Sequence, residues 1–124
     1  MSTIALNEAN FESTVLAEGI TIVDFWAEWC GPCKMFGPIF EKSSNAHPEI
    51  RFAKVDTQAE QGLAAALQIQ SIPTIMIFRD GILLFNQAGA MPEHSLEEII
   101  TTAEGLNMEE IRAEIEMLEK GNQG

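Results

Sequence analysis

The chain carries the stretch Val23-Asp24-Phe25-Trp26-Ala27-Glu28-Trp29-Cys30-Gly31-Pro32-Cys33-Lys34, from which its fold and its chemistry are best argued. This stretch holds the only two cysteines of the chain, Cys30 and Cys33, directly after an apolar run. Asp24 lies inside that run, where a charge is hardest to solvate. Two thiols at this spacing can form and give up one disulfide, so the motif predicts redox chemistry.

The hydrophobic patterns around the motif predict a chain of alternating strands and helices. Residues 20–26 are nearly all apolar, which is typical of a central strand covered on both faces. A helix is expected from Cys33 to about Ala46, with Pro38 inside it as a kink. The other expected strands are 3–6, 50–55, 74–78 and 82–88, and the other expected helices are 10–18, 59–67 and 93–104. The order predicts an α/β fold: a mixed five-stranded sheet with helices on both faces.

Glycines mark the expected ends of several elements. Gly19 is expected to end the helix 10–18, and Gly105 to stop the helix 93–104. The Asp80-Gly81 pair between two apolar runs is a strong signal for a β-hairpin. The helix 10–18 is expected to place Phe11, Val15 and Leu16 on one side, and the strand 50–55 to place Ile50, Phe52 and Lys54 on one face.

Composition limits the classes of function. The 124 residues suit one domain with a real core, expected to span residues 1–105. A net charge of −12 argues against binding to nucleic acid or to anionic membranes, because both would repel the chain. No secretory signal or membrane span is apparent, so the expectation is a cytoplasmic protein, where a disulfide is usually transient and catalytic.

Residues 106–124 differ from the rest of the chain. From Glu93 onward there are nine glutamates and only two basic residues, Arg112 and Lys120. Asn107 can cap a last helix, on which Met108, Ile111, Ile115 and Leu118 form a narrow apolar seam. Three alternatives stay open for this acidic extension: a frayed surface helix, a helix packed back on the domain, or a contact with a second copy or another partner.

The expected position of the cysteines favours disulfide exchange. Cys30 should end the loop after a strand, and Cys33 should lie in the first turn of a helix, whose free N–H groups and partial positive charge favour a thiolate on the more exposed sulfur. Pro32 stiffens the turn, and Gly31 allows close approach by another chain. Cys30 is expected to attack a partner's disulfide, after which Cys33 attacks Cys30 and releases the reduced partner.

Asp24 is the candidate for moving the proton. A carboxylate buried behind the motif without full pairing should have a raised pKa, so it could take the proton from Cys33 near neutral pH. Lys54 is expected beside it, with its aliphatic stem in apolar surface. The alternatives are an Asp24 satisfied by local hydrogen bonds and a Lys54 that is simply solvated.

The motif resembles that of the thioredoxin family. The resemblance rests on residues 23–34 and continues through Pro38, Lys54, Ser71-Ile72-Pro73-Thr74, Asp80-Gly81 and Gly89, and it spans about residues 3–105. It implies the thioredoxin fold, with the acidic helix as an addition. It also implies that Cys30 is the nucleophile, Cys33 the resolving thiol, Asp24 the buried acid and base, and Pro73 a cis proline facing the disulfide.

The resemblance further implies a docking surface and a source of electrons. The docking surface would consist of Trp29, Gly31, Pro32, Ile72, Pro73, Gly89 and Ala90. No cofactor would be bound, because reducing equivalents would come from NADPH through a separate flavin-dependent thioredoxin reductase. The partners would be that reductase and proteins that contain disulfides.

Several of these residues have other possible roles. The cysteine pair could be a structural disulfide or half of a metal site, but His47 and His94 lack ligand spacing to it, so no metal is expected there. Both histidines are expected to face solvent. Trp26 is expected to be mainly structural, and Gly89 could be a bulge glycine. The alternatives to a general disulfide reductase are a thioredoxin-like binding subunit that acts through its acidic helix, a reductase dedicated to one partner, and an oxidant.

Overall fold

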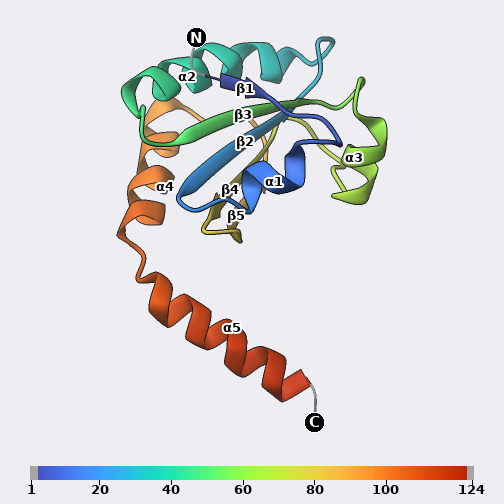
Figure 1. The fold of residues 1–124 in the computed structure, drawn as a ribbon. Coiled ribbons are helices and arrows are strands. Elements are labelled where there is room, and N and C mark those ends of the chain that lie inside the picture. Colours follow the sequence, from blue (N-terminus) through green and yellow to red (C-terminus); the bar gives the residue numbers. More distant parts are fainter. Residues whose placement is uncertain (1–2, 123–124) are drawn as a thin grey trace.

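A five-stranded mixed sheet forms the centre of the protein, with strand order β1-β3-β2-β4-β5 (Figure 1). The computed structural model describes residues 3–122. The strands are β1 (Thr3–Ala5), β2 (Ile20–Trp26), β3 (Arg51–Asp56), β4 (Thr74–Arg79) and β5 (Ile82–Ala88). The helices are α1 (Phe11–Val15), α2 (Gly31–Ala46), α3 (Gln61–Ala66), α4 (Glu93–Gly105) and α5 (Met108–Asn122). The predicted fold class is confirmed.

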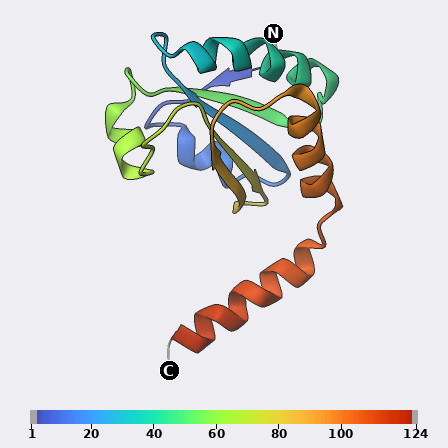
Figure 2. The ribbon, with the colours of Figure 1, turned by 180° about the vertical axis from the view of Figure 1, so that it is seen from behind.

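The strand β2 is the middle of the sheet and is covered on both faces, as its apolar sequence predicted. It pairs in parallel with β3 and antiparallel with β4. Successive side chains of a strand point to opposite faces. Ile22 therefore joins a core with residues of α2 and α4, whereas Val23 joins a second core with residues of α1 (Figures 1 and 2). By the same alternation, Asp24 lies on the face that α2 and α4 cover.

The neighbouring strand β3 repeats this division. Ile50 and Phe52 belong to the core on the α2 side, as predicted, while Val55 belongs to the other core. Lys54 shares the face of Phe52 and is the register partner of Asp24. The pairing of β2 with β3 therefore sets the two ionisable groups side by side at the edge of the core.

Two short helices are shorter than predicted because turns replace their ends. The helix α1 ends at Val15, and Leu16 is 55% exposed instead of packed beside Phe11. Gly19, with φ of +89°, then starts the turn into β2. Before α3, the Asp56 carboxylate accepts hydrogen bonds from the N–H groups of Gln58 and Ala59, and this forms a turn where the first helical residues were expected.

The hairpin between β4 and β5 turns at Asp80 and Gly81, as predicted. Both residues have positive φ, of 52° and 81°. Positive φ at both central positions suits a primed two-residue turn, which matches the twist of the two strands. The Asp80 side chain also accepts a hydrogen bond from Gly19 N–H at 2.8 Å, so the hairpin tip is tied to the start of β2.

The end of α4 differs from the prediction that Gly105 would stop it. The helix continues through Gly105, whose φ is not positive, and the chain leaves in extended form at Leu106. The guanidinium of Arg79 supplies the missing donors: its Nη1 lies 2.8, 3.1 and 3.1 Å from the carbonyl oxygens of Ala103, Glu104 and Leu106. The side chain of Arg79 on β4 therefore caps the C-terminus of α4, where the sequence predicted a cap formed by Gly105.

The predicted acidic helix is present as α5. Asn107 caps it, because its Oδ1 accepts hydrogen bonds from the N–H groups of Glu109 and Glu110 at 3.1 and 3.2 Å. Met108 is buried, Ile111 and Ile115 are half-buried, and Leu118 is 69% exposed. The first turns of the helix thus lie against the domain, and the helix then extends away from the sheet (Figure 1). An ion pair of 2.9 Å between Arg112 and Asp80 supports the near half.

His47 is not the solvent-facing residue that was expected, whereas His94 is exposed. His47 is half-buried at the end of α2, with Nε2 2.7 Å from Glu97 Oε2 on α4 and its ring stacked on Phe52. Burial acts to lower its pKa, but hydrogen bonds and charges from Glu97 and Glu49 outweigh burial and raise the pKa above its ordinary value. The return of α4 to the end of α2 buries this ring.

Truncation after Gly105 should leave a folded domain with unchanged disulfide-reducing activity. The change removes the buried side chain of Met108, which stabilises the folded state by about 1–3 kcal/mol. It also removes the exposed ion pair between Arg112 and Asp80, which contributes at most about 1 kcal/mol to the free energy of unfolding. Thermal unfolding and a disulfide-reduction assay measure the result, and Arg112→Ala in the full chain isolates the ion pair. Loss of activity in a truncated protein that still unfolds cooperatively would contradict the expectation.

Candidate redox site

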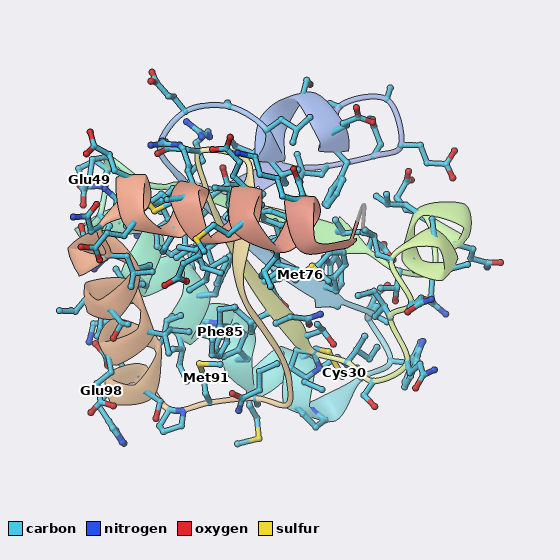
Figure 3. All side chains as sticks on the ribbon, turned by 90° about the horizontal axis from the view of Figure 1, so that it is seen from below. Cys30, Glu49, Met76, Phe85, Met91 and Glu98 are labelled. Carbon is cyan, nitrogen blue, oxygen red and sulfur yellow. A yellow bond between two sulfur atoms is a disulfide. The ribbon has the colours of Figure 1, made fainter. Side chains whose placement is uncertain are left out.

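The two cysteines lie where β2 gives way to α2. Cys30 is the N-cap residue of α2, and Cys33 lies in its first turn, as predicted. They form a disulfide with their Cα atoms 5.2 Å apart (Figure 3). The N–H of Cys33 points at Cys30 Sγ, 3.2 Å away, and Cys30 accepts Lys34 N–H through its carbonyl oxygen. A free amide of the first helical turn is therefore aimed at one sulfur of the pair.

This arrangement favours a thiolate at Cys30 once the disulfide is reduced. A sulfur that accepts a backbone N–H at the N-terminus of a helix meets both a hydrogen bond and the positive end of the helix dipole. Pro32 near the start of the helix costs no hydrogen bond, because the first N–H groups of a helix have no partner within it. The local sequence thus places Cys30 where the helix terminus favours its thiolate.

Exposure hardly distinguishes the two cysteines, so it does not identify the more exposed sulfur to which the sequence analysis assigned the thiolate. Cys30 is 3% exposed and Cys33 5%. Both pack in a small apolar cluster with Ala27, Trp26 and Ile72. Their surroundings differ instead. Cys30 Sγ lies 3.7 Å from the carbonyl oxygen of Ile72, in the loop that precedes β4.

Cys33 lines a cavity of about 180 Å³ on the other side of the motif. The cavity is also lined by Lys54, the register partner of Asp24, and by Trp26. Glu28 and Lys34, which the sequence did not single out, form part of its wall. Cys33 therefore shares this cavity with Lys54 of β3, while Cys30 faces the loop that contains Ile72.

Asp24 is the most perturbed acid of the site. It is 1% exposed, and neither of its carboxylate oxygens has a hydrogen-bond partner among the described residues. The alternative of an Asp24 satisfied by local hydrogen bonds is therefore wrong. Burial raises its pKa from 3.8 to about 7, even though the charge of Lys54 acts to lower it. A carboxyl group with this pKa can give or accept a proton near neutral pH.

Lys54 influences Asp24 through its charge and not through a close contact. None of the ion pairs among residues 3–122 joins the two side chains. The ammonium group lies 5.0 Å from the centre of the Trp26 ring, in a cation–π contact. Trp26 is half-buried, so it holds the lysine at the edge of the cavity and supports the site as a structural residue.

Contacts between backbone atoms link the predicted docking loops. The bond between Ile72 and Pro73 is cis, and Gly89 N–H donates to the Pro73 carbonyl oxygen at 2.7 Å. Gly89 has φ of +108°, a conformation that glycine adopts readily. With the contact from Cys30 to Ile72, these bonds gather the cysteine loop, the proline loop and the end of β5 in one region.

The exposure of the predicted docking residues is uneven. Trp29 is 65% exposed, and Gly31, Pro32, Gly89 and Ala90 are also exposed. Ile72 is half-buried and Pro73 is buried, so Pro73 offers little surface of its own. Met35 is 76% exposed and was not among the predicted residues. It follows Pro32 by three residues on α2, and that helical spacing was the available signal.

No helix within residues 3–122 is both long enough and apolar enough to cross a membrane.

Comparison with known proteins agrees with this geometry. Residues 2–102 match the family model described as Thioredoxin. The chain is 50% identical over 111 residues to Putative thioredoxin 2 of Streptomyces coelicolor, covering 90% of this chain and 83% of that protein. It is 34% identical to the thioredoxin of Staphylococcus saprophyticus over 81% of this chain and 96% of that protein.

A solved structure shows the same fold. The thioredoxin of Malassezia sympodialis superposes with a TM-score of 0.74 at 32% identity, over 82% of this chain and 93% of that one. The family model spans most of the chain and includes the cysteine pair, Asp24 and Pro73. The chain therefore belongs to the thioredoxin family, as its motif indicated, and is a protein-disulfide reductase with a redox-active Cys30–Cys33 pair.

Proposed function

We propose that the protein reduces disulfides in a range of partner proteins by dithiol exchange through Cys30 and Cys33. The Cys30 thiolate attacks one sulfur of the partner's disulfide, which forms a mixed disulfide and releases one partner thiolate. Cys33 then attacks Cys30, which forms the Cys30–Cys33 disulfide and releases the second partner thiolate. Two electrons pass from the cysteine pair to the partner.

One observation carries the assignment of roles: the N–H of Cys33 is aimed at Cys30 Sγ at the N-terminus of α2. This interaction favours the charged form of Cys30, which therefore attacks first. No N–H group within residues 3–122 donates to Cys33 Sγ, so Cys33 needs a base to become a nucleophile. The second step is fast because Cys33 is three residues from Cys30 and reacts within one molecule.

Asp24 is the base for Cys33 in this proposal, and Lys54 adjusts its pKa. The proposal is supported by the pKa of about 7 and by the cavity that Cys33 and Lys54 share. When Asp24 is ionised, it can accept the Cys33 proton. When the partner leaves, the same carboxyl can return a proton, so a single buried group serves both directions of exchange.

Partners are proposed to bind across the docking surface of Trp29, Gly31, Pro32, Ile72, Pro73, Gly89 and Ala90. The exposed Trp29 supplies apolar contact area, and the Ile72 carbonyl near Cys30 marks where an extended partner segment would lie. The electron source is proposed to be NADPH through a separate thioredoxin reductase, and the location cytoplasmic. Both proposals rest on the likeness to the thioredoxin family.

The alternative function is a binding subunit that acts through its acidic helix. The observation in its favour is α5, which extends from the domain and exposes Met117 and Leu118 to 73% and 69%. A contact of α5 with a second copy or another partner would use this end. A reductase dedicated to one partner remains a narrower alternative within the same chemistry.

Replacement of each cysteine should separate the two steps. Cys30→Ser is expected to reduce insulin turnover, with dithiothreitol as the electron donor, to the uncatalysed background, because the attacking thiolate is gone. Cys33→Ser should accumulate mixed disulfides with protein partners, visible by mass spectrometry, because nothing resolves them. Undiminished turnover by Cys30→Ser would refute the proposed mechanism.

Asp24→Asn should stabilise the protein by an amount that grows as the pH rises from about 4 to about 7. Since the folded pKa is raised, the cost of the buried charge is absent below the unfolded pKa of 3.8 and complete once the pH rises past about 7. The variant should match the original chain at pH 4 and exceed its free energy of unfolding by up to about 4 kcal/mol at pH 8. The resolving step should become slower.

Urea unfolding between pH 4 and pH 8 measures this effect. Glu12→Gln, at an exposed acid on α1, is the matched control and should change stability little at any pH. Lys54→Met keeps the aliphatic stem and removes the charge, so it should raise the pKa of Asp24 further. A stability difference for Asp24→Asn that stays constant with pH would show that its carboxyl does not titrate in this range.

The double variant Cys30→Ser/Cys33→Ser tests the binding-subunit alternative. It keeps the fold and α5 but cannot exchange disulfides. A reductase predicts that the double variant fails to restore function in cells that lack the protein. Full restoration by the double variant, together with failure of the chain truncated after Gly105, would favour the binding function.

A further inference from the structure

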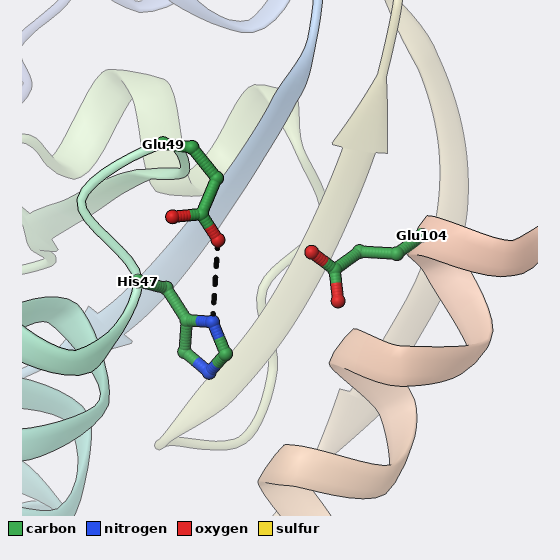
Figure 4. Close-up of side chains that lie close together, drawn as sticks. All are labelled: His47, Glu49 and Glu104. Atoms are coloured by element: carbon green, nitrogen blue, oxygen red, sulfur yellow. Dashed lines mark hydrogen bonds and ion pairs between the residues drawn. The ribbon is translucent and has the colours of Figure 1, made fainter.

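Three potential metal ligands meet at the end of the sheet that the redox mechanism does not use. His47 is the C-cap residue of α2, Glu49 follows in the loop before β3, and Glu104 lies in the last turn of α4. One nitrogen of His47 and one carboxylate oxygen from each glutamate lie within 4.8 Å of one another (Figure 4). Residues 47 and 104 meet only because α4 packs beside the end of α2.

The ring of His47 is held so that Nδ1 faces this group. Its Nε2 lies 2.7 Å from Glu97 Oε2, and its Nδ1 lies 3.4 Å from Glu49 Oε1 (Figure 4). A carboxylate only accepts hydrogen bonds, and a neutral imidazole carries one N–H. In the protonated ring, Nε2–H donates to Glu97 and Nδ1–H donates to Glu49. In the neutral ring that keeps its N–H on Glu97, the lone pair of Nδ1 faces the oxygen of Glu49, and a cation between these two atoms would take the place of the proton.

The distances suit a small transition-metal ion. Two ligand atoms on a tetrahedral zinc ion are roughly 3.4 Å apart, given bonds of about 2.1 Å. The pair Nδ1 and Glu49 Oε1 already has this separation, at 3.4 Å. Glu104 must move closer by about an ångström. Its exposed side chain makes no hydrogen bond or ion pair among the described residues, so it is free to do so.

The local charges also favour a cation. Both α2 and α4 end here, and the C-terminus of a helix carries partial negative charge. Arg79 shares a cavity of about 300 Å³ with Glu49 and Glu104. Its Nη1 donates to the last carbonyl oxygens of α4, and none of the ion pairs within residues 3–122 joins Arg79 to either carboxylate. The cavity leaves room for a water molecule as a further ligand.

We propose that His47 Nδ1, Glu49 and Glu104 bind one zinc ion, with water in the remaining position. Glu97 orients the imidazole from behind, as carboxylates commonly do for zinc-bound histidines. The imidazole nitrogen selects zinc over magnesium and calcium, which take oxygen ligands. The ion would join the loop before β3 to the end of α4, next to the junction with α5, and so stiffen that end of the domain.

This site is independent of the cysteine pair. Glu49 precedes the first residue of β3, whereas Cys30 follows the last residue of β2, and the two strands are parallel. The two groups therefore lie at opposite ends of the sheet, and Figure 3 shows Glu49 and Cys30 far apart. A reduced cysteine pair would itself bind zinc, so the test must use the oxidised protein.

The test is a calorimetric titration of the oxidised full chain with zinc chloride, with free thiols shown to be absent. One saturable site is expected. His47→Gln and Glu104→Gln should each weaken the affinity at least about 10-fold, because each removes a direct ligand. The matched controls are His94→Gln and Glu98→Gln, which change the same residue types on α4 outside the group and should leave the affinity unchanged.

Two further readouts distinguish the loss of a zinc ligand from a variant that fails to fold. Zinc should raise the Tm of the oxidised protein and of both controls, and should raise that of Glu104→Gln less at the same zinc concentration, although the contact between His47 and Glu97 is intact in that variant. The ¹⁵N shift of His47 Nδ1 should move on zinc addition, while that of His94 stays constant. Absence of saturable binding, equal binding by His47→Gln, or equal binding of magnesium would each overturn the proposal.

Discussion

The parallel pairing of β2 with β3 is the constraint on which the rest of the structure depends. It sets Asp24 opposite Lys54 inside the sheet and brings the C-terminal end of β2 to the point where α2 begins. The start of α2 then supplies the amide that points at Cys30, while the face beneath it holds the carboxyl group of Asp24. The helix terminus thus acts on Cys30, and the buried acid is proposed to act on Cys33.

The buried carboxyl group of Asp24 lowers the stability of the folded protein and gives the site a group that can titrate near neutral pH. A carboxyl group without hydrogen bonds inside an apolar core disfavours the folded state whenever it is charged. Lys54 offsets part of that cost, but its ammonium rests over Trp26 and does not pair with Asp24. The resulting pKa of about 7 is that of a group able to move protons at physiological pH. A fully paired Asp24 would stabilise the folded protein, but its pKa would lie further from physiological pH.

The two ends of the sheet carry different groups of side chains. The end after β2 carries the disulfide and the loops around Ile72 and Gly89, and the opposite end gathers His47, Glu49 and the last turn of α4. Arg79 caps α4 there, and Asp80 beside it holds Arg112 of α5. Neighbouring residues of the β4–β5 hairpin therefore fix both the end of the domain and the start of its acidic extension.

The sequence by itself determined what short-range patterns encode. The apolar run of β2, the Asp80-Gly81 turn, the cap at Asn107 and the place of Cys30 before a helix all follow from neighbours along the chain. Only the tertiary structure decided which groups meet from distant segments: the cap of Arg79 on α4, the burial of His47 against Glu97, the nearly equal burial of both cysteines, and the contact of Lys54 with Trp26. The reason is physical, since hydrophobic periodicity shows which face of an element is buried but not which distant side chain covers it.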